Sequence, residues 1–168
     1  MARAPQIIVL MGPAGAGKTT VGELLAQSLG WRFLDADAFH SPENVGRMRR
    51  GIGLTDADRA PWLHAMRNAL RDLHARGESV VLACSALKER YRRALVPRGA
   101  AKDVRFVYLR VQEPVLRERL AHRSGHYAGP ALLGSQLATL EEPRDALWID
   151  ASPEPAEIVR RIRSDLAV

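Results

Sequence analysis

The sequence contains a single cysteine, few aromatic residues and no long apolar run. One cysteine, Cys84, among 168 residues excludes an internal disulfide and suits a reducing compartment. No apolar stretch approaches the roughly 20 residues that a membrane-spanning helix needs. The short apolar run after the N-terminus is too brief for the core of a signal peptide. We therefore expect a cytoplasmic protein with no membrane partner.

Blocks of positive charge are also missing, although the chain is basic, with a net charge of +6. No run of lysine and arginine is longer than two residues, and only 5% of the residues are aromatic. Proteins that bind single-stranded nucleic acid usually stack bases on aromatic side chains. We therefore predict no nucleic-acid partner and attribute the charge to a cleft for small phosphorylated and carboxylated molecules. A nucleic-acid binder or a non-catalytic nucleotide-dependent regulator remains the distant alternative.

Short apolar segments alternate with segments of helical periodicity along the whole chain. This alternation predicts an α/β fold, a five-stranded parallel sheet with helices on both faces, in one domain over residues 1–168. The predicted strands are 6–11, 31–35, 79–84, 104–109 and 147–150. The predicted helices are 18–29, 61–76, 86–96, 113–122, 130–140 and 154–166.

The segment from Gly12 to Thr19 fits the phosphate-loop pattern G-x-x-x-x-G-K-[ST]. A β-branched apolar run precedes it and a helical pattern follows it, which is the context that the motif requires. We expect ATP as the cofactor, with Lys18 at the β- and γ-phosphates and the Thr19 hydroxyl on Mg²⁺. The predicted cofactor-binding residues of this segment are Gly12, Ala14, Gly15, Ala16, Gly17, Lys18, Thr19 and Thr20.

Two aspartates, Asp35 and Asp37, follow the second predicted strand. The strand at 79–84 ends without an acidic residue, so the acidic partner of Mg²⁺ must come from elsewhere. A spacing of two on an extended segment would aim the two carboxylates differently. We assign Asp35 to the metal and Asp37 to the base that accepts the proton of a substrate hydroxyl. A solvated strand end with a helix-capping aspartate is the alternative.

A polar stretch over about 38–62 is expected to bind the substrate. Arginine is well suited to bind a carboxylate through two hydrogen bonds, and we favour Arg59, with Arg47 second. His40 either touches the substrate or is structural. The alternative for the arginines is a solvated face, and the segment after Thr55 also fits a helix N-cap with an acid three residues later.

Further polar residues follow the third and fourth predicted strands. Ser85 and Lys88 can reach the same cleft, whereas Cys84 is expected to be a buried filler. Arg119 and Arg123 lie one helical turn apart, in a predicted lid over about 119–143. Phosphoryl transfer gains from an arginine that closes on the transferring group, so Arg123 joins Lys18 and Asp37 as a predicted catalytic residue. A pair of surface charges is the alternative.

Several ordered motifs together resemble the small bacterial type of gluconate kinase. The resemblance covers about residues 7–150, nearly the whole chain. Its most specific parts are the stretch from Cys84 to Tyr91 and the stretch from Gly125 to Pro143. The phosphate loop, the segment from Asp35 to His40 and the block from Asn44 to Leu63 add to it.

The resemblance implies ATP- and Mg²⁺-dependent phosphorylation of D-gluconate on a three-layer P-loop fold like that of nucleoside monophosphate kinases. It also implies a homodimer, with Arg119 near adenine and Arg123 in the lid. The full set of expected substrate-binding residues is Asp37, His40, Arg47, Arg59, Ser85, Lys88 and His126. A kinase of the same fold that acts on shikimate or another small acid is the nearer alternative.

Overall fold

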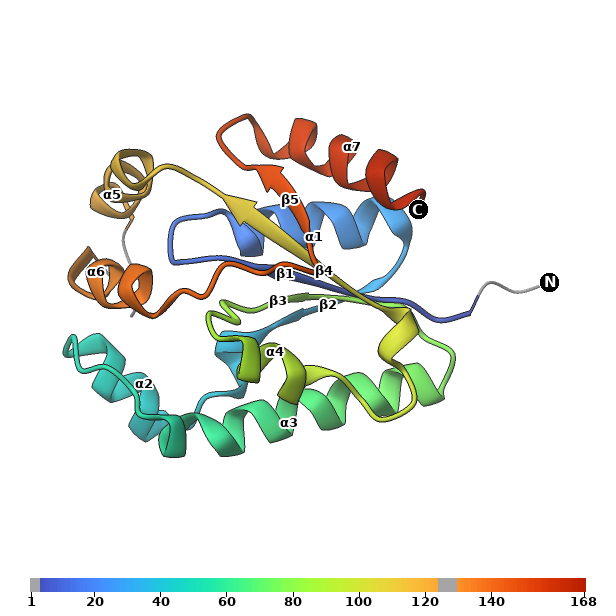
Figure 1. The fold of residues 1–168 in the computed structure, drawn as a ribbon, viewed down its shortest axis with the longest axis horizontal. Helices are drawn as coiled ribbons and strands as arrows, with labels where there is room; N and C mark the ends of the chain where they lie inside the picture. The colour runs from blue at the N-terminus through green and yellow to red at the C-terminus, as the bar shows by residue number, and fades with distance from the viewer. Residues whose placement is uncertain (1–3, 124–129) are drawn as a thin grey trace.

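A computed structural model describes residues 4–123 and 130–168 of the chain. Its centre is a parallel five-stranded sheet in the order β2-β3-β1-β4-β5 (Figure 1). The strands are β1 (Ile7–Met11), β2 (Arg32–Asp35), β3 (Val80–Ala83), β4 (Val104–Arg110) and β5 (Leu147–Asp150). The five strands and the α/β fold predicted from the sequence are confirmed.

The sheet separates two apolar layers, and β1 contributes to both because successive side chains of a strand point to opposite faces. Ile8 and Leu10 pack in the layer with α1 (Lys18–Leu29) and α7 (Pro155–Leu166). Ile7, Val9 and Met11 pack in the layer with α3 (Asp56–Ala75) and α4 (Glu89–Leu95). All five side chains of β1 are fully buried, as expected for the central strand of such a sheet.

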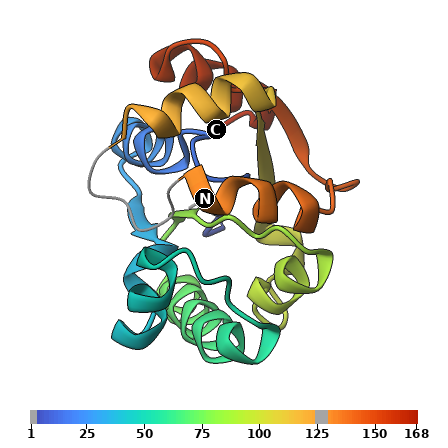
Figure 2. The ribbon, with the colours of Figure 1, turned by 90° about the vertical axis from the view of Figure 1, so that its left-hand side faces the viewer.

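Three further helices gather at the carboxyl end of the strands (Figure 1). They are α2 (Pro42–Arg49), α5 (Glu113–Ala121) and α6 (Pro130–Thr139). Viewed from that end, α6 lies between α5 above and the α3 and α4 pair below (Figure 2). Short 3-10 helices cover Ala36–Phe39 and Ala101–Asp103. Within the described residues, no helix is both long enough and apolar enough to cross a membrane.

Three helix predictions need correction. α2 was not predicted; Ser41 caps it by accepting a hydrogen bond from the Asn44 N–H, and Pro42 occupies its first turn. α3 begins at Asp56 rather than at 61, so Pro61 lies inside the helix and not in its first turn. α4 begins at Glu89 rather than at 86, because Ala86 has a left-handed backbone (φ 45°) that no helix continues.

The early start of α3 follows from a capping box. The Thr55 hydroxyl accepts a hydrogen bond from the Asp58 N–H at 3.1 Å, and the Asp58 carboxylate accepts one from the Thr55 N–H at 2.7 Å. Two backbone donors that the helix cannot satisfy itself are thereby paired. The alternative reading of this segment as an N-cap is confirmed.

We predict that Thr55→Ala lowers the free energy of unfolding by about 1 kcal/mol, because the Asp58 N–H loses its acceptor. Thr55→Ser keeps a hydroxyl and should remain close to the parent protein. Urea unfolding of the three proteins measures the effect. Equal stability of the alanine and serine variants would contradict the role of the cap.

Candidate functional site

The loop between β1 and α1 depends on glycine at two positions. Gly17 caps α1 in the left-handed region (φ 90°), where a side chain is rarely tolerated. A Cβ on Gly12 would lie 3.0 Å from the Leu109 carbonyl oxygen, so this position also requires glycine. The loop leads directly into the N-terminus of α1, a position at which proteins commonly bind phosphate.

Lys18 lies at the start of α1 and reaches back over this loop. Its Nζ donates a hydrogen bond to the Pro13 carbonyl oxygen at 3.0 Å. Desolvation by the surrounding protein lowers the pKa of Lys18, while the nearby Asp37 carboxylate acts in the opposite direction. The ammonium group therefore lies in a partly buried site, where its charge is poorly screened and the Asp37 carboxylate is within electrostatic range.

Asp35 and Asp37 stand opposite the loop at the end of β2. The Thr19 hydroxyl donates a hydrogen bond to Asp35 Oδ2 at 2.9 Å, so the two predicted metal ligands are neighbours. Asp35 Oδ1 accepts from the Asp37 N–H, also at 2.9 Å, which caps the 3-10 helix Ala36–Phe39. The expectation of an extended segment here is wrong, but the turn still brings both carboxylates to the pocket.

His40 stacks on Trp62, with 4.3 Å between ring centroids and an angle of 8° between the rings. Trp62 is fixed in turn, because its indole N–H donates to the Ala36 carbonyl oxygen at 2.7 Å. Burial, aided by the positive charge of Arg59, lowers the pKa of His40 to about 4. Its imidazole is therefore neutral at physiological pH and can donate and accept hydrogen bonds.

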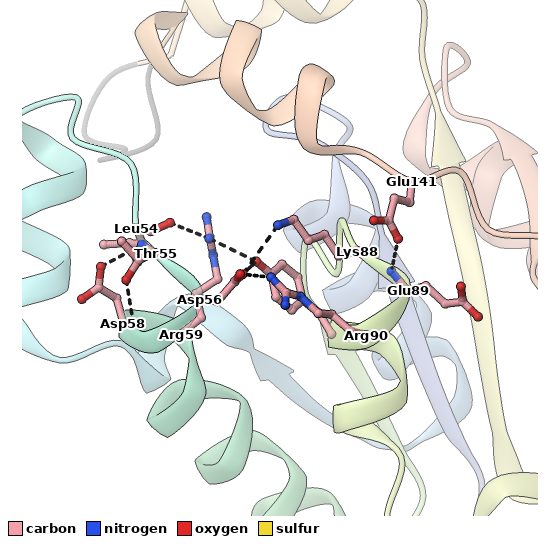
Figure 3. Close-up of polar contacts among 10 residues, drawn as sticks. Leu54, Thr55, Asp56, Asp58, Arg59, Lys88, Glu89, Arg90 and Glu141 are labelled. Atoms are coloured by element: carbon pink, nitrogen blue, oxygen red, sulfur yellow. Dashed lines mark hydrogen bonds and ion pairs between the residues drawn. The ribbon is translucent and has the colours of Figure 1, made fainter.

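A second polar cluster joins the start of α3 to the start of α4 (Figure 3). Asp56 pairs with Arg90, accepts a hydrogen bond from the Tyr91 hydroxyl, and lies 3.6 Å from Lys88 Nζ. Arg59 Nη1 donates to the Leu54 carbonyl oxygen at 2.6 Å and to the Tyr91 hydroxyl at 3.3 Å.

Most of the predicted site residues line one pocket at the carboxyl end of the sheet. Its wall contains eight predicted residues besides the glycines and alanine of the loop, together with residues that were not predicted. The predicted ones are Lys18, Thr19, Asp35, Asp37, His40, Arg59, Ser85 and Arg123. The unpredicted ones with polar or aromatic groups are Trp62, Cys84, Tyr91 and Gln136.

Other predicted substrate residues do not line this pocket. Arg47 Nη1 pairs with Asp58 at 3.1 Å, and Lys88 lies beside the Tyr91 ring, 5.6 Å from its centroid. His126 falls outside the described residues. Gly12 lies beneath the loop, where its N–H donates to the Ser85 carbonyl oxygen at 3.2 Å.

A second pocket adjoins the first across the phosphate loop. Gly15, Gly17 and Arg123 line both pockets, and Ala16, Thr20 and Arg119 line the second. The Arg119 guanidinium is fixed by carbonyl oxygens, donating to Gly15 at 3.2 Å and to Ala151 at 2.8 Å. The arrangement offers separate compartments on the two sides of one anion-binding loop.

Sequence reasoning missed the contributions of Tyr91 and Gln136, and only their positions inside distinctive motifs could have pointed to them. Trp62 is a core residue, 5% exposed, that also lines the pocket. Cys84 is buried as expected, and burial raises the pKa of its thiol to about 12, which keeps it protonated and unreactive.

Known proteins resemble the chain in sequence and in structure. A family model described as an AAA domain matches residues 7–143. The gluconokinase of Gluconobacter oxydans (strain 621H) is 48% identical over 84% of this chain and 78% of its own length. A gluconokinase structure from Sinorhizobium meliloti 1021 aligns with a TM-score of 0.84 at 46% identity, covering 98% of this chain and 93% of the other. An unliganded sugar kinase from Janibacter sp. HTCC2649 aligns with a TM-score of 0.88 at 39% identity, over 98% and 95% of the two chains.

The low pKa of His40 predicts a specific pH dependence of stability. Between about pH 6.5 and 4 the unfolded chain binds a proton at this histidine and the folded protein does not. Protonation of His40 therefore does not reduce the free energy of unfolding above about pH 6.5. Below that pH the free energy of unfolding falls as the pH drops toward 4. In His40→Gln this part of the decline should vanish, and urea unfolding at a series of pH values measures it. Parallel pH profiles of the parent and the variant would contradict the assignment.

Proposed function

The chain belongs to the gluconokinase family, and on that premise we propose that it transfers the γ-phosphoryl group of ATP to D-gluconate, giving 6-phospho-D-gluconate. The observation that carries the proposal is the single pocket lined by Lys18 of the phosphate loop, by Asp37 and by Arg59. Its lining offers cations and hydroxyls to a polyphosphate and to a hydroxy acid. The family relationship favours gluconate over shikimate as the acceptor.

ATP would lie across the phosphate loop, with its phosphates in the first pocket and its base in the second. Loop N–H groups and Lys18 would hold the β- and γ-phosphates. Arg119 presents a guanidinium whose donors are already bonded to carbonyl oxygens, so its planar face remains suitable for stacking on adenine.

Thr19 and Asp35 fit Mg²⁺, because their oxygens lie 2.9 Å apart at the edge of the phosphate loop. Mg²⁺ usually takes one or two protein oxygens and completes its shell with water and phosphate. Consistent with this, the described residues contain no cluster of three or more histidine, cysteine or acidic side chains that could form a complete cage. When bound, Mg²⁺ would neutralise charge on the β- and γ-phosphates.

The protein's part in the transfer is to position the reactants and to balance charge. Asp37 would accept the proton of the primary hydroxyl of gluconate as the bond to phosphorus forms. Lys18 and Arg123 would offset the charge on the transferring group. A pocket wall that includes Trp62 and Leu87 helps to exclude water, which would otherwise hydrolyse ATP.

Gluconate would lie between Asp37 and the α3–α4 junction. Arg59 would bind its carboxylate, and His40 and Ser85 would bind its hydroxyls, since all three line the pocket. Lys88 and Arg47 would join them only by leaving Asp56 and Asp58, their present partners. His126 is proposed as a substrate residue on the family resemblance alone.

We further propose that the enzyme works in the cytoplasm as a homodimer without a nucleic-acid partner. The dispersed arginines support the absence of a nucleic-acid partner, because many pair with acids on their own helix, such as Arg117 with Glu113 and Arg161 with Glu157.

The proposed homodimer is supported by Trp148, which is 44% exposed on the outer strand β5 and offers a partner surface at that edge. Light scattering of the purified protein measures the mass.

We predict that the purified protein forms 6-phosphogluconate from Mg-ATP and D-gluconate, detected as NADPH through 6-phosphogluconate dehydrogenase. Lys18→Ala should abolish turnover, because the γ-phosphate loses its main cationic partner. ADP formation with shikimate or another acid, but not with gluconate, would support kinase activity and exclude gluconate as the acceptor. Absence of ADP with every acceptor would favour a nucleotide-binding regulator.

We predict that Asp37→Asn lowers kcat roughly 10²–10⁴-fold, the usual contribution of a general base. The dissociation constant of a non-hydrolysable ATP analogue should stay nearly unchanged, because Asp37 faces the acceptor. Asp165→Asn, an exposed carboxylate on α7, is the matched control and should retain parent activity. A parent-like kcat in Asp37→Asn would show that another group accepts the proton.

A further inference from the structure

Gln136 of helix α6 makes a hydrogen bond to the phosphate loop. Its Oε1 accepts a hydrogen bond from the Ala14 N–H at 2.7 Å, across 122 positions of sequence. The residue is half-buried and lines the pocket together with Lys18, Asp37 and Arg123. None of the roles derived above uses this contact.

The contact fixes which end of the carboxamide faces the loop. A backbone N–H needs an acceptor, so the oxygen must be the atom turned toward Ala14, and the assignment does not depend on the choice of amide flip. The Nε2 group is then the other end of the same planar amide. It carries two donors in the pocket wall, at the rim of the site where the loop binds phosphate.

A set of bonds anchors the C-terminal end of α6 and so holds Gln136 in place. Arg92, only 8% exposed, donates to the carbonyl oxygens of Ala86 at 2.8 Å and of Glu141 at 2.9 Å. The Glu141 N–H donates to the Leu87 carbonyl oxygen at 2.8 Å, and the Glu141 carboxylate accepts from the Glu89 N–H at 2.9 Å. The end of α6 is therefore tied to the segment that follows β3.

Gln136 lies one helical turn before this anchor, with its carbonyl oxygen bonded to the Leu140 N–H at 2.9 Å. A side chain so close to a buried anchor keeps its place over the phosphate loop. This is the preorganisation that stabilisation of a developing charge requires, since fixed donors need no rearrangement when the charge forms.

We propose that Gln136 is a further catalytic residue of the phosphoryl transfer. Its Oε1 stays on the Ala14 N–H, and its Nε2 donates a hydrogen bond to an oxygen of the transferring phosphoryl group. The proposal rests on the proposed kinase function. A neutral donor suits this position, because Lys18 and Arg123 already supply positive charge and a carboxylate there would repel the phosphates.

Two variants separate the donor from the bond to the loop. Gln136→Met has a similar length and no amide, whereas Gln136→Glu keeps an acceptor for Ala14 but loses the donor and adds negative charge. We expect both to lower kcat, by roughly 10²–10³-fold for the loss of one such donor. In Gln136→Met the dissociation constant of a non-hydrolysable ATP analogue should change little. Gln27→Met, at an exposed position of α1, is the matched control.

A binding measurement supplies a readout that needs no acceptor. ADP with aluminium fluoride mimics the transferring phosphoryl group, so both Gln136 variants should bind it at least 10-fold more weakly than the parent, and Gln136→Met should bind ADP alone normally. This comparison decides the role of Gln136 even if gluconate proves not to be the acceptor. Circular dichroism and thermal unfolding check that the variants are folded.

Three results would overturn the proposal. A parent-like kcat in Gln136→Glu would show that only the bond to Ala14 matters. Tighter binding of the ATP analogue by Gln136→Met, with undiminished kcat, would make Gln136 a competitor of phosphate for the loop. Unchanged binding of ADP with aluminium fluoride by both variants would exclude contact with the transferring group.

Discussion

The candidate site depends on the parallel alignment of β1, β3 and β2. The register pairs Leu10 with Ala83, and Ala83 with Asp35, so these three strands end at the same level. The phosphate loop, the segment that begins at Cys84 and the two aspartates therefore emerge side by side. The hydrogen bond from Gly12 to Ser85 joins the first two of these segments directly. A slip of one residue in either pairing would turn every side chain of that strand to the wrong face of the sheet.

Sequence patterns predicted the parts of this arrangement that depend on local rules. Buried strands of a parallel sheet are recognised as short apolar runs. A glycine-rich loop of this pattern between a strand and a helix indicates phosphate binding. The same rules, applied fully, would have found α2, because Ser41 and Pro42 are a capping residue and a first-turn proline. The predicted helix start at residue 61 was wrong because the capping box at Thr55 is the stronger local signal.

The remaining features arise from contacts between distant parts of the chain. The left-handed backbone of Ala86 is held in place where Arg92 and Glu141 meet the segment after β3, and no local propensity predicts it. In the sequence Tyr91 is an ordinary helical residue, and only the fold brings its hydroxyl into hydrogen bonds with Asp56 and Arg59 of α3. Gln136 gains its position only when α6 reaches the phosphate loop. Such roles arise from contacts between residues that are distant in sequence, and a single sequence does not show which distant residues are in contact.

The partners of the basic side chains divide them into two groups with different consequences for ligand binding. Arg47 lies against Asp58, while Lys88 and Arg90 share Asp56, and these carboxylates offset part of their charge. Lys18 and Arg59 instead donate to carbonyl oxygens or a phenol, and within the described residues neither has a carboxylate at ion-pair distance. A neutral acceptor orients a cation without neutralising it, so these two keep their charge for a ligand. One stands at the phosphate loop and the other near the start of α3. Two separate cations match a pair of ligands that carries phosphates and a carboxylate, and Asp37 and Gln136 line the same pocket.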